Sequence, residues 1–86
     1  MRLALTKDIM APSHKRSLTE RFPDVLRALR QEKRLSQEQL AERAGLHRTY
    51  VSMMERAESV PTLRTLEQLA AGIGVPVSAI LKRMEE

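Results

Sequence analysis

The chain of 86 residues has no cysteine, no tryptophan, one phenylalanine and one tyrosine. The lack of cysteine excludes disulfides, thiolate metal sites and a cysteine nucleophile. The shortage of aromatic side chains argues against proteins that bind single-stranded nucleic acid by stacking bases on aromatic rings, whereas it leaves duplex binding open. Stability must therefore come from the packing of aliphatic side chains.

Long apolar segments are missing as well. No stretch is long enough to span a membrane, and the opening residues MRLALTKDIM show neither the apolar core nor the small-residue cleavage site of a signal peptide. We therefore expect no membrane contact and a cytoplasmic location. A chain of this length also has room for only one small domain.

The sequence carries few features of an enzyme. It has no glycine-rich phosphate loop, and neither His14 nor His47 stands in a spacing typical of a metal site or a catalytic triad. We therefore predict a protein that is not an enzyme, with no catalytic residue, no metal site and no cofactor.

Positive charge is concentrated towards the N-terminus, within a formal net charge of +4. Residues 1–34 contain nine Lys or Arg and four Asp or Glu, residues 35–57 contain three of each, and residues 58–86 contain three against four. A basic segment favours a polyanionic partner. Because basic ends also occur in proteins that bind no nucleic acid, the charge supports such a partner only together with a motif.

Residues 36–56, SQEQLAERAGLHRTYVSMMER, predict two short helices joined at Gly45. Ser36 and Gln39 have the spacing of a capping box, which places the first helix start at about Gln37. Glycine is favoured where this helix must stop and the chain must turn with a positive φ. The pattern is typical of a DNA-binding helix-turn-helix over residues 37–56, and the alternative is a plain helical hairpin. Five apolar positions fit two helices that press on a common core: Leu40, Ala44, Leu46, Val51 and Met54.

Three further helices follow from the apolar spacing. We expect one to start near Pro23, one to start at Pro61 and Thr62 and to end at Gly74, and one to lie near the C-terminus. The inward positions of these three helices are Phe22, Val25, Leu26 and Leu29; then Leu63, Leu66, Leu69, Ala70 and Ile73; and finally Val77, Ile80, Leu81 and Met84.

The predicted fold class is therefore all-α, with five short helices around one core. Residues 1–21 are predicted to form an N-terminal arm, and residues 22–86 the helix-turn-helix domain. Docking of residues 1–17 onto a partner subunit is our hypothesis for the arm.

A family resemblance extends from about Val25 to Leu81. The order of LRALRQEKRLSQEQLAERAGLHRTYVSMMER, a short loop, PTL and LEQLAAGIGV resembles the Cro/C1-type (XRE-like) helix-turn-helix family of phage repressors and bacterial regulators. The segment GLHRTYVSMMER on such a short chain looks most like the controller proteins of restriction-modification systems.

The resemblance implies a compact, lambda-repressor-like DNA-binding domain with five helices. It further implies a homodimer that binds a near-palindromic operator in double-stranded DNA and regulates transcription, and it leaves a contact with RNA polymerase open. The alternative is an antitoxin or another protein-interaction module of the same fold, which the unassigned N-terminal arm allows.

The outward positions of the second helix of the motif are the expected base readers, because such a helix presents its N-terminal turns to base edges in the major groove. Arg48 can donate two hydrogen bonds to guanine O6 and N7, and Thr49 can offer its methyl group to thymine. Ser52 and Met53 lie on the same face. The alternative for all four is a solvated helix face.

Five further residues are expected near DNA phosphates. The resemblance implies a phosphate contact for Gln37, for which the alternative is a simple helix-start residue. His47 falls at the N-cap of the second helix, where it would cap the helix or contact a phosphate. Tyr50 would either reach a phosphate or pack against the first helix. Arg43 and Arg56 lie at helix ends close to the expected DNA backbone, or are ordinary surface charges.

The resemblance also implies a partly buried ion pair between Arg30 and Glu55, for which the alternative is two unpaired surface groups. Directly after it the chain departs from the family pattern, because Ala57 stands where glycine is usual. A positive φ there would cost about 1 kcal/mol or more, so we expect the loop to leave the helix differently. Glu58 in this loop would also repel a nearby phosphate.

The last two helices carry more apolar positions than a minimal core needs. We expect some of them to be shared with a second subunit, Val77, Ile80 or Met84 in particular. The candidates for a dimer interface are Val75, Val77, Ile80, Leu81 and Met84.

Overall fold

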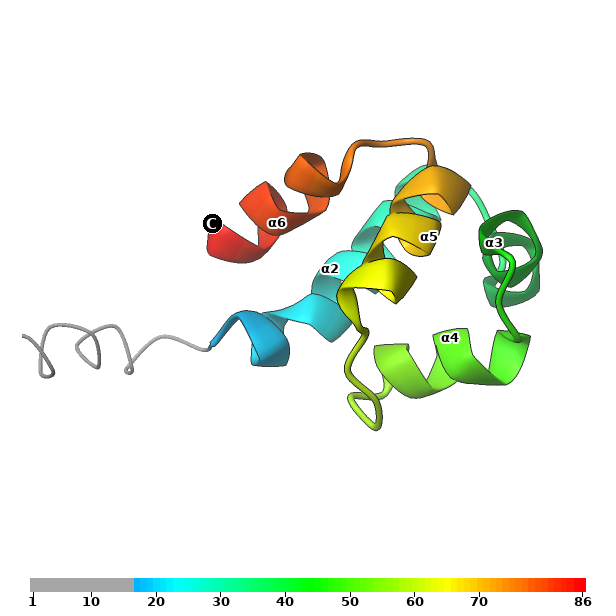
Figure 1. The fold of residues 1–86 in the computed structure, drawn as a ribbon, viewed down its shortest axis with the longest axis horizontal. Coiled ribbons are helices and arrows are strands. Elements are labelled where there is room, and N and C mark those ends of the chain that lie inside the picture. Colours follow the sequence, from blue (N-terminus) through cyan, green and yellow to red (C-terminus); the bar gives the residue numbers. More distant parts are fainter. Residues whose placement is uncertain (1–16) are drawn as a thin grey trace, which may run out of the picture.

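The computed structural model describes residues 17–86, and within this range it consists of helices and connecting turns without a strand (Figure 1). The predicted all-α class with five helices is confirmed for this part of the chain. Most of the predicted arm lies outside the described residues. The helices are α2 (Leu18–Glu32), α3 (Gln37–Ala44), α4 (Arg48–Glu55), α5 (Leu63–Ile73) and α6 (Val77–Glu85).

Helix α2 begins earlier than the predicted start near Pro23. Ser17 caps it, because its Oγ accepts a hydrogen bond from Glu20 N at 3.2 Å while its own N–H donates to Glu20 Oε1 at 2.9 Å. Pro23 therefore lies inside the helix, which continues although proline has no N–H to donate. Residues 18–21 belong to this helix and not to an arm.

The other predicted helix ends agree with the structure. The Ser36 and Gln39 capping box is present, with distances of 2.8 and 3.0 Å, and Gly45 ends α3 with φ +72°. Thr62 caps α5 by accepting a hydrogen bond from Thr65 N at 3.0 Å. Local chemistry thus fixes both ends of α3 and the start of α5.

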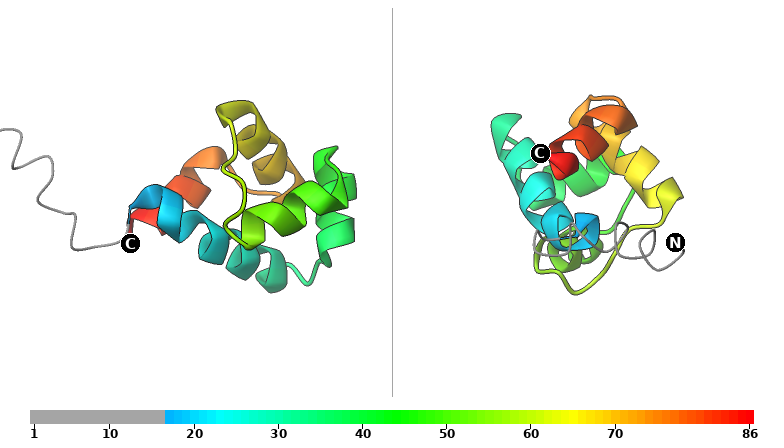
Figure 2. Two further views of the ribbon diagram at one scale, coloured as in Figure 1. Left: turned by 90° about the horizontal axis from the view of Figure 1, so that it is seen from below. Right: turned by 90° about the vertical axis from the view of Figure 1, so that its left-hand side faces the viewer.

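The helices enclose one core. Helix α3 packs against α4 and α5, while α2 packs against α4 and α6 (Figures 1 and 2). Two predicted inward residues are wrong, since Leu63 at the start of α5 is 72% exposed and Leu81 of α6 is 36% exposed. The buried apolar residues are Phe22, Leu26, Leu29, Leu40, Ala41, Ala44, Val51, Met54, Leu66, Leu69, Ala70, Ile73, Ile80 and Met84.

The approach of α5 to α3 depends on Gly72. A Cβ atom at this position would lie 3.1 Å from both the backbone N and the Cβ of Ala44, and 3.1 Å from Leu40 Cδ1. The amide of Gln68 on α5 also donates to the carbonyl oxygen of Ala44 at 3.2 Å, which satisfies one acceptor at the end of α3. Helix α5 therefore serves as the support against which α3 is positioned.

No helix formed by residues 17–86 combines the length and the apolar character needed to cross a membrane.

Candidate nucleic-acid interface

Helix α4 has one apolar and one polar face. Val51 and Met54 are fully buried against the core. The predicted base readers lie on the other side: Arg48 and Thr49 are exposed, and Ser52 and Met53 are partly exposed. All four share one accessible face, as a helix that reads bases would require.

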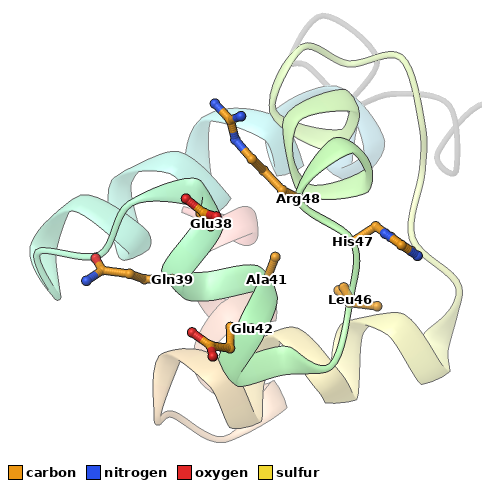
Figure 3. A pocket seen from close by; sticks show the side chains of 7 residues that line it. All are labelled: Glu38, Gln39, Ala41, Glu42, Leu46, His47 and Arg48. Atoms are coloured by element: carbon orange, nitrogen blue, oxygen red, sulfur yellow. The ribbon is translucent and has the colours of Figure 1, made fainter.

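A pocket lies between α3 and the start of α4 (Figure 3). Glu38 and Glu42 of α3 contribute carboxylates to it, and Arg48 contributes a guanidinium group. Figure 3 shows Arg48 and His47 extending in different directions. The carboxylates disfavour a phosphate inside this pocket, so the phosphate contact predicted for His47 would lie outside it. The other residues that line it are Gln39, Ala41, Leu46 and His47.

The structure contains the predicted ion pair between Arg30 and Glu55. Arg30 Nε donates to Glu55 Oε2 at 2.7 Å, and Arg30 Nη2 donates to Glu55 Oε1 at 2.9 Å. The two side chains are 12% and 1% exposed, respectively. Bidentate pairing of this kind combines charge with a fixed planar geometry, so it holds α4 against α2.

Two further residues join the pair. Gln37 at the start of α3 donates its amide to Glu55 Oε1 at 3.0 Å, and Arg27 donates to the carbonyl oxygen of Glu55 at 2.8 Å. Glu55 therefore connects α2, α3 and α4. Sequence reasoning missed this network, because the crossing of α3 and α4 brings Gln37 and Glu55 together and no local motif signals the contact.

The network also sets the ionisation of Glu55. Burial alone would raise the pKa of this carboxyl group, but hydrogen bonds from Arg30 and Gln37 and the positive charges of Arg30 and Arg27 lower it. The net shift of the pKa is downward, so Glu55 is a carboxylate at neutral pH.

Gln37 has a second interaction besides its expected role at a phosphate. Because a carboxylate accepts hydrogen bonds but cannot donate them, Glu55 fixes the side-chain amide of Gln37 with its NH₂ group towards Glu55. One N–H of this group is not used by that bond. The phosphate contact of Gln37 stays a prediction.

Arg56 is paired with Glu58 in the loop after α4. Its Nε and Nη2 donate to the two carboxylate oxygens of Glu58 at 3.0 and 2.9 Å, and its Nη1 donates to Ser52 Oγ. A phosphate would therefore compete with Glu58 for this guanidinium group. The separate hydrogen bond from Nη1 connects Arg56 to the expected base reader Ser52.

The remaining phosphate candidates differ in their surroundings. Arg43 and His47 are exposed, and the His47 side chain makes no capping hydrogen bond although this residue occupies the N-cap of α4. Tyr50 is partly buried and packs against the core, and its phosphate contact stays a prediction.

The prediction that the loop after α4 leaves the helix in a different conformation is wrong. Ala57 has φ +63°, so the loop keeps the left-handed conformation in spite of the side chain. Arg34, in the turn between α2 and α3, also has a positive φ, at +57°, which was not predicted from the sequence.

The candidates for a dimer interface separate into two groups. Ile80 and Met84 are 1% and 7% exposed, so they belong to the core of this chain and have little surface to offer to a partner. Val75 and Val77 are partly buried, and Leu81 is 36% exposed. Three exposed apolar side chains were not among the candidates: Leu18, at 44%, Val60, at 60%, and Leu63, at 72%.

Comparison with known proteins identifies relatives. The model of a family described as helix-turn-helix matches residues 26–80. The chain is 44% identical over 66 residues to control protein C.SmaI of Serratia marcescens. This match covers 77% of this chain and 79% of C.SmaI. The chain is also 46% identical over 56 residues to the immunity repressor of Bacillus phage phi105. This match covers 65% of this chain but only 39% of the repressor.

A solved structure shares the fold. The structure of C.Esp1396I bound to a 19 base pair DNA duplex superposes with a TM-score of 0.75 at 30% sequence identity. The match covers 81% of this chain and 93% of that one.

Proposed function

This chain belongs to the helix-turn-helix family of Cro/C1-type regulators, and on that premise we propose that it binds double-stranded DNA sequence-specifically and regulates transcription. The likeness to control proteins favours the role of a restriction-modification controller. The observation that carries the proposal is the polar face of α4, which is held in an accessible position by the buried Glu55 network.

In the proposed complex, α4 enters the major groove with its N-terminal turns. Arg48 reads a guanine, and Thr49, Ser52 and Met53 face neighbouring base edges. Gln37 contacts a phosphate at the start of α3, where the free N–H groups of the helix favour an anion. Further phosphate contacts come from Arg43, His47, Tyr50 and Arg56.

The direct test is titration of a labelled DNA duplex with the protein at several salt concentrations. Neutralised phosphates release counterions, so the logarithm of the binding constant should fall linearly with the logarithm of the salt concentration, by about 0.9 per phosphate contact. Absence of duplex binding at low salt, or binding that does not respond to salt, would contradict the proposal.

We further propose that the protein is a homodimer that binds two half-sites about one helical turn apart, with a contact to RNA polymerase outside the DNA-binding face. Its interface would use Val60 and Leu63, which are exposed between α4 and the first turn of α5, together with Leu81. Exposed aliphatic side chains of this size gain free energy when a partner covers them.

A charge at the interface is expected to separate the subunits. Leu63→Glu should raise the dimer dissociation constant about tenfold or more, equivalent to about 1.4 kcal/mol, because the carboxylate would have to lose water. Sedimentation velocity across a concentration series measures this constant. The matched variant Leu81→Glu tests the part of the interface on α6. If Leu81→Glu separates the subunits and Leu63→Glu does not, the interface lies on α6 and not at Val60 and Leu63. A monomeric wild type would exclude the homodimer.

A further inference from the structure

The turn between α2 and α3 places a long side chain where the backbone favours glycine. Arg34 has φ +57°, its N–H donates to the carbonyl oxygen of Gln31 at 2.9 Å, and Leu35 N donates to the carbonyl oxygen of Arg30 at 3.1 Å. This is a helix-ending arrangement in which a left-handed residue is usually glycine, because a Cβ atom crowds the backbone there. The arginine therefore strains the turn, and this strain calls for an explanation.

Contacts within the fold do not provide one. Arg34 is exposed, and among residues 17–86 its side chain has no hydrogen-bond or ion-pair partner. The nearby carboxylate of Glu32 is engaged by Arg83, at 2.9 and 2.7 Å. Within the described part of the chain, no opposite charge pairs with the guanidinium group of Arg34, which is held on a strained backbone.

The position of the turn supplies the explanation. It leads through Ser36 directly into Gln37, the residue that the proposed complex places at a phosphate. In the view of Figure 2 from below, which looks onto α4, the turn between α2 and α3 lies in open view beside the start of α3. An arginine side chain at this edge is long enough to reach an anion beyond the start of α3.

We propose that Arg34 binds a phosphate of duplex DNA outside the contact of Gln37, an inference that rests on the proposed function. The planar guanidinium group matches a phosphate with two parallel hydrogen bonds. Such a contact strengthens binding to every sequence and specifies none. It also accounts for an arginine at a position where glycine would be less strained.

The test replaces Arg34 by the residue that the backbone prefers. Arg34→Gly should raise the melting temperature by a few degrees, because the strain disappears. It should weaken binding to all duplexes several-fold and reduce the salt slope by about 0.9 for each arginine, or about 1.8 for a dimer. Arg34→Lys should retain most of the slope, and Arg34→Asn, which also tolerates this conformation, should behave like the glycine variant.

The chain provides a matched control at Ala57. This residue ends α4 with φ +63° and the same hydrogen-bond pattern, from Ala57 N to Met54 O at 3.2 Å and from Glu58 N to Met53 O at 2.8 Å. Ala57→Gly relieves the same kind of strain without a change of charge. It should raise the melting temperature and leave the salt slope unchanged.

The outcomes separate this inference from the proposed function. If the wild type binds duplex DNA with a steep salt slope and Arg34→Gly retains both slope and affinity, the phosphate contact is refuted. A lower melting temperature of that variant would then show that the positive charge of Arg34 stabilises the C-terminal end of α2, where cations are favourable. If the wild type itself does not bind duplex DNA, the proposed function fails and the Arg34 contact falls with it.

Discussion

Replacing Glu55 with glutamine is expected to lower the free energy of unfolding by about 3 kcal/mol, at the lower end of the range for a buried ion pair that loses one partner. The Arg30 side chain is 12% exposed, so it would keep its charge without an anion and with little water. The glutamine amide has one acceptor oxygen in place of two, and its NH₂ group would face the donors of Arg30 or Gln37. Urea denaturation at neutral pH measures the loss.

Glu58→Gln is the control for this variant. It removes the same charge by the same chemical change, but the Arg56 and Glu58 side chains are 53% and 52% exposed. An exposed pair contributes about 0–1 kcal/mol, so we expect a small loss. Equal melting temperatures of wild type and Glu55→Gln would refute the structural role assigned to Glu55.

Glu55→Gln should also change how the free energy of unfolding depends on pH. The pKa of Glu55 in the folded chain lies below its ordinary value of 4.5, so its contribution is complete above that value and is lost as the pH falls through the lowered pKa. Arg83 lowers the pKa of Glu32 in both proteins. The difference between wild type and Glu55→Gln below about pH 4.5 therefore isolates Glu55, and it should shrink on acidification.

Arg48→Ala is expected to remove the preference for one base pair in each half-site. A bidentate contact to guanine contributes about 1–3 kcal/mol of discrimination, and a dimer would lose it in both half-sites. The side chain is exposed, so the fold should keep its melting temperature. Binding constants for the operator and for duplexes with single base changes measure the effect.

Gln37→Ala provides the contrast to Arg48→Ala. A phosphate contact carries no sequence information, so its loss should weaken all duplexes about equally. The structure adds that Gln37 also contacts Glu55, and some loss of stability should accompany the change. A uniform loss for both variants would show that the base readers are assigned wrongly.

Local sequence chemistry predicted the helix-turn-helix itself. Ser36, Gln39 and Gly45 form their cap and turn from neighbours in the chain, so the helix boundaries at this motif required no tertiary information. The same capping spacing exists at Ser17 and Glu20, but our prediction started the helix near Pro23, a residue favoured at helix starts, and did not use this cap. The start of α2 was therefore predictable, and a competing signal concealed it.

The parts of the site that depend on tertiary contacts were harder to predict. The link from Gln37 to Glu55 requires the crossing of α3 and α4. The Arg56–Glu58 pair is local, but it spans Ala57, whose left-handed conformation was not expected. Leu63 is the first residue of α5 and is 72% exposed, although its spacing fits the apolar stripe. Periodicity identifies helices, but it does not determine which end residues the neighbouring helices cover.

Selection of bound sequences from a library of random DNA duplexes tests the central claim most directly. We predict that the wild type enriches two inverted copies of one short half-site, with centres about one helical turn apart, and that Arg48→Ala loses enrichment of a guanine in each copy. Enrichment of no sequence, or of a single unsymmetrical site that does not respond to Arg48→Ala, would contradict a dimer that reads DNA through α4.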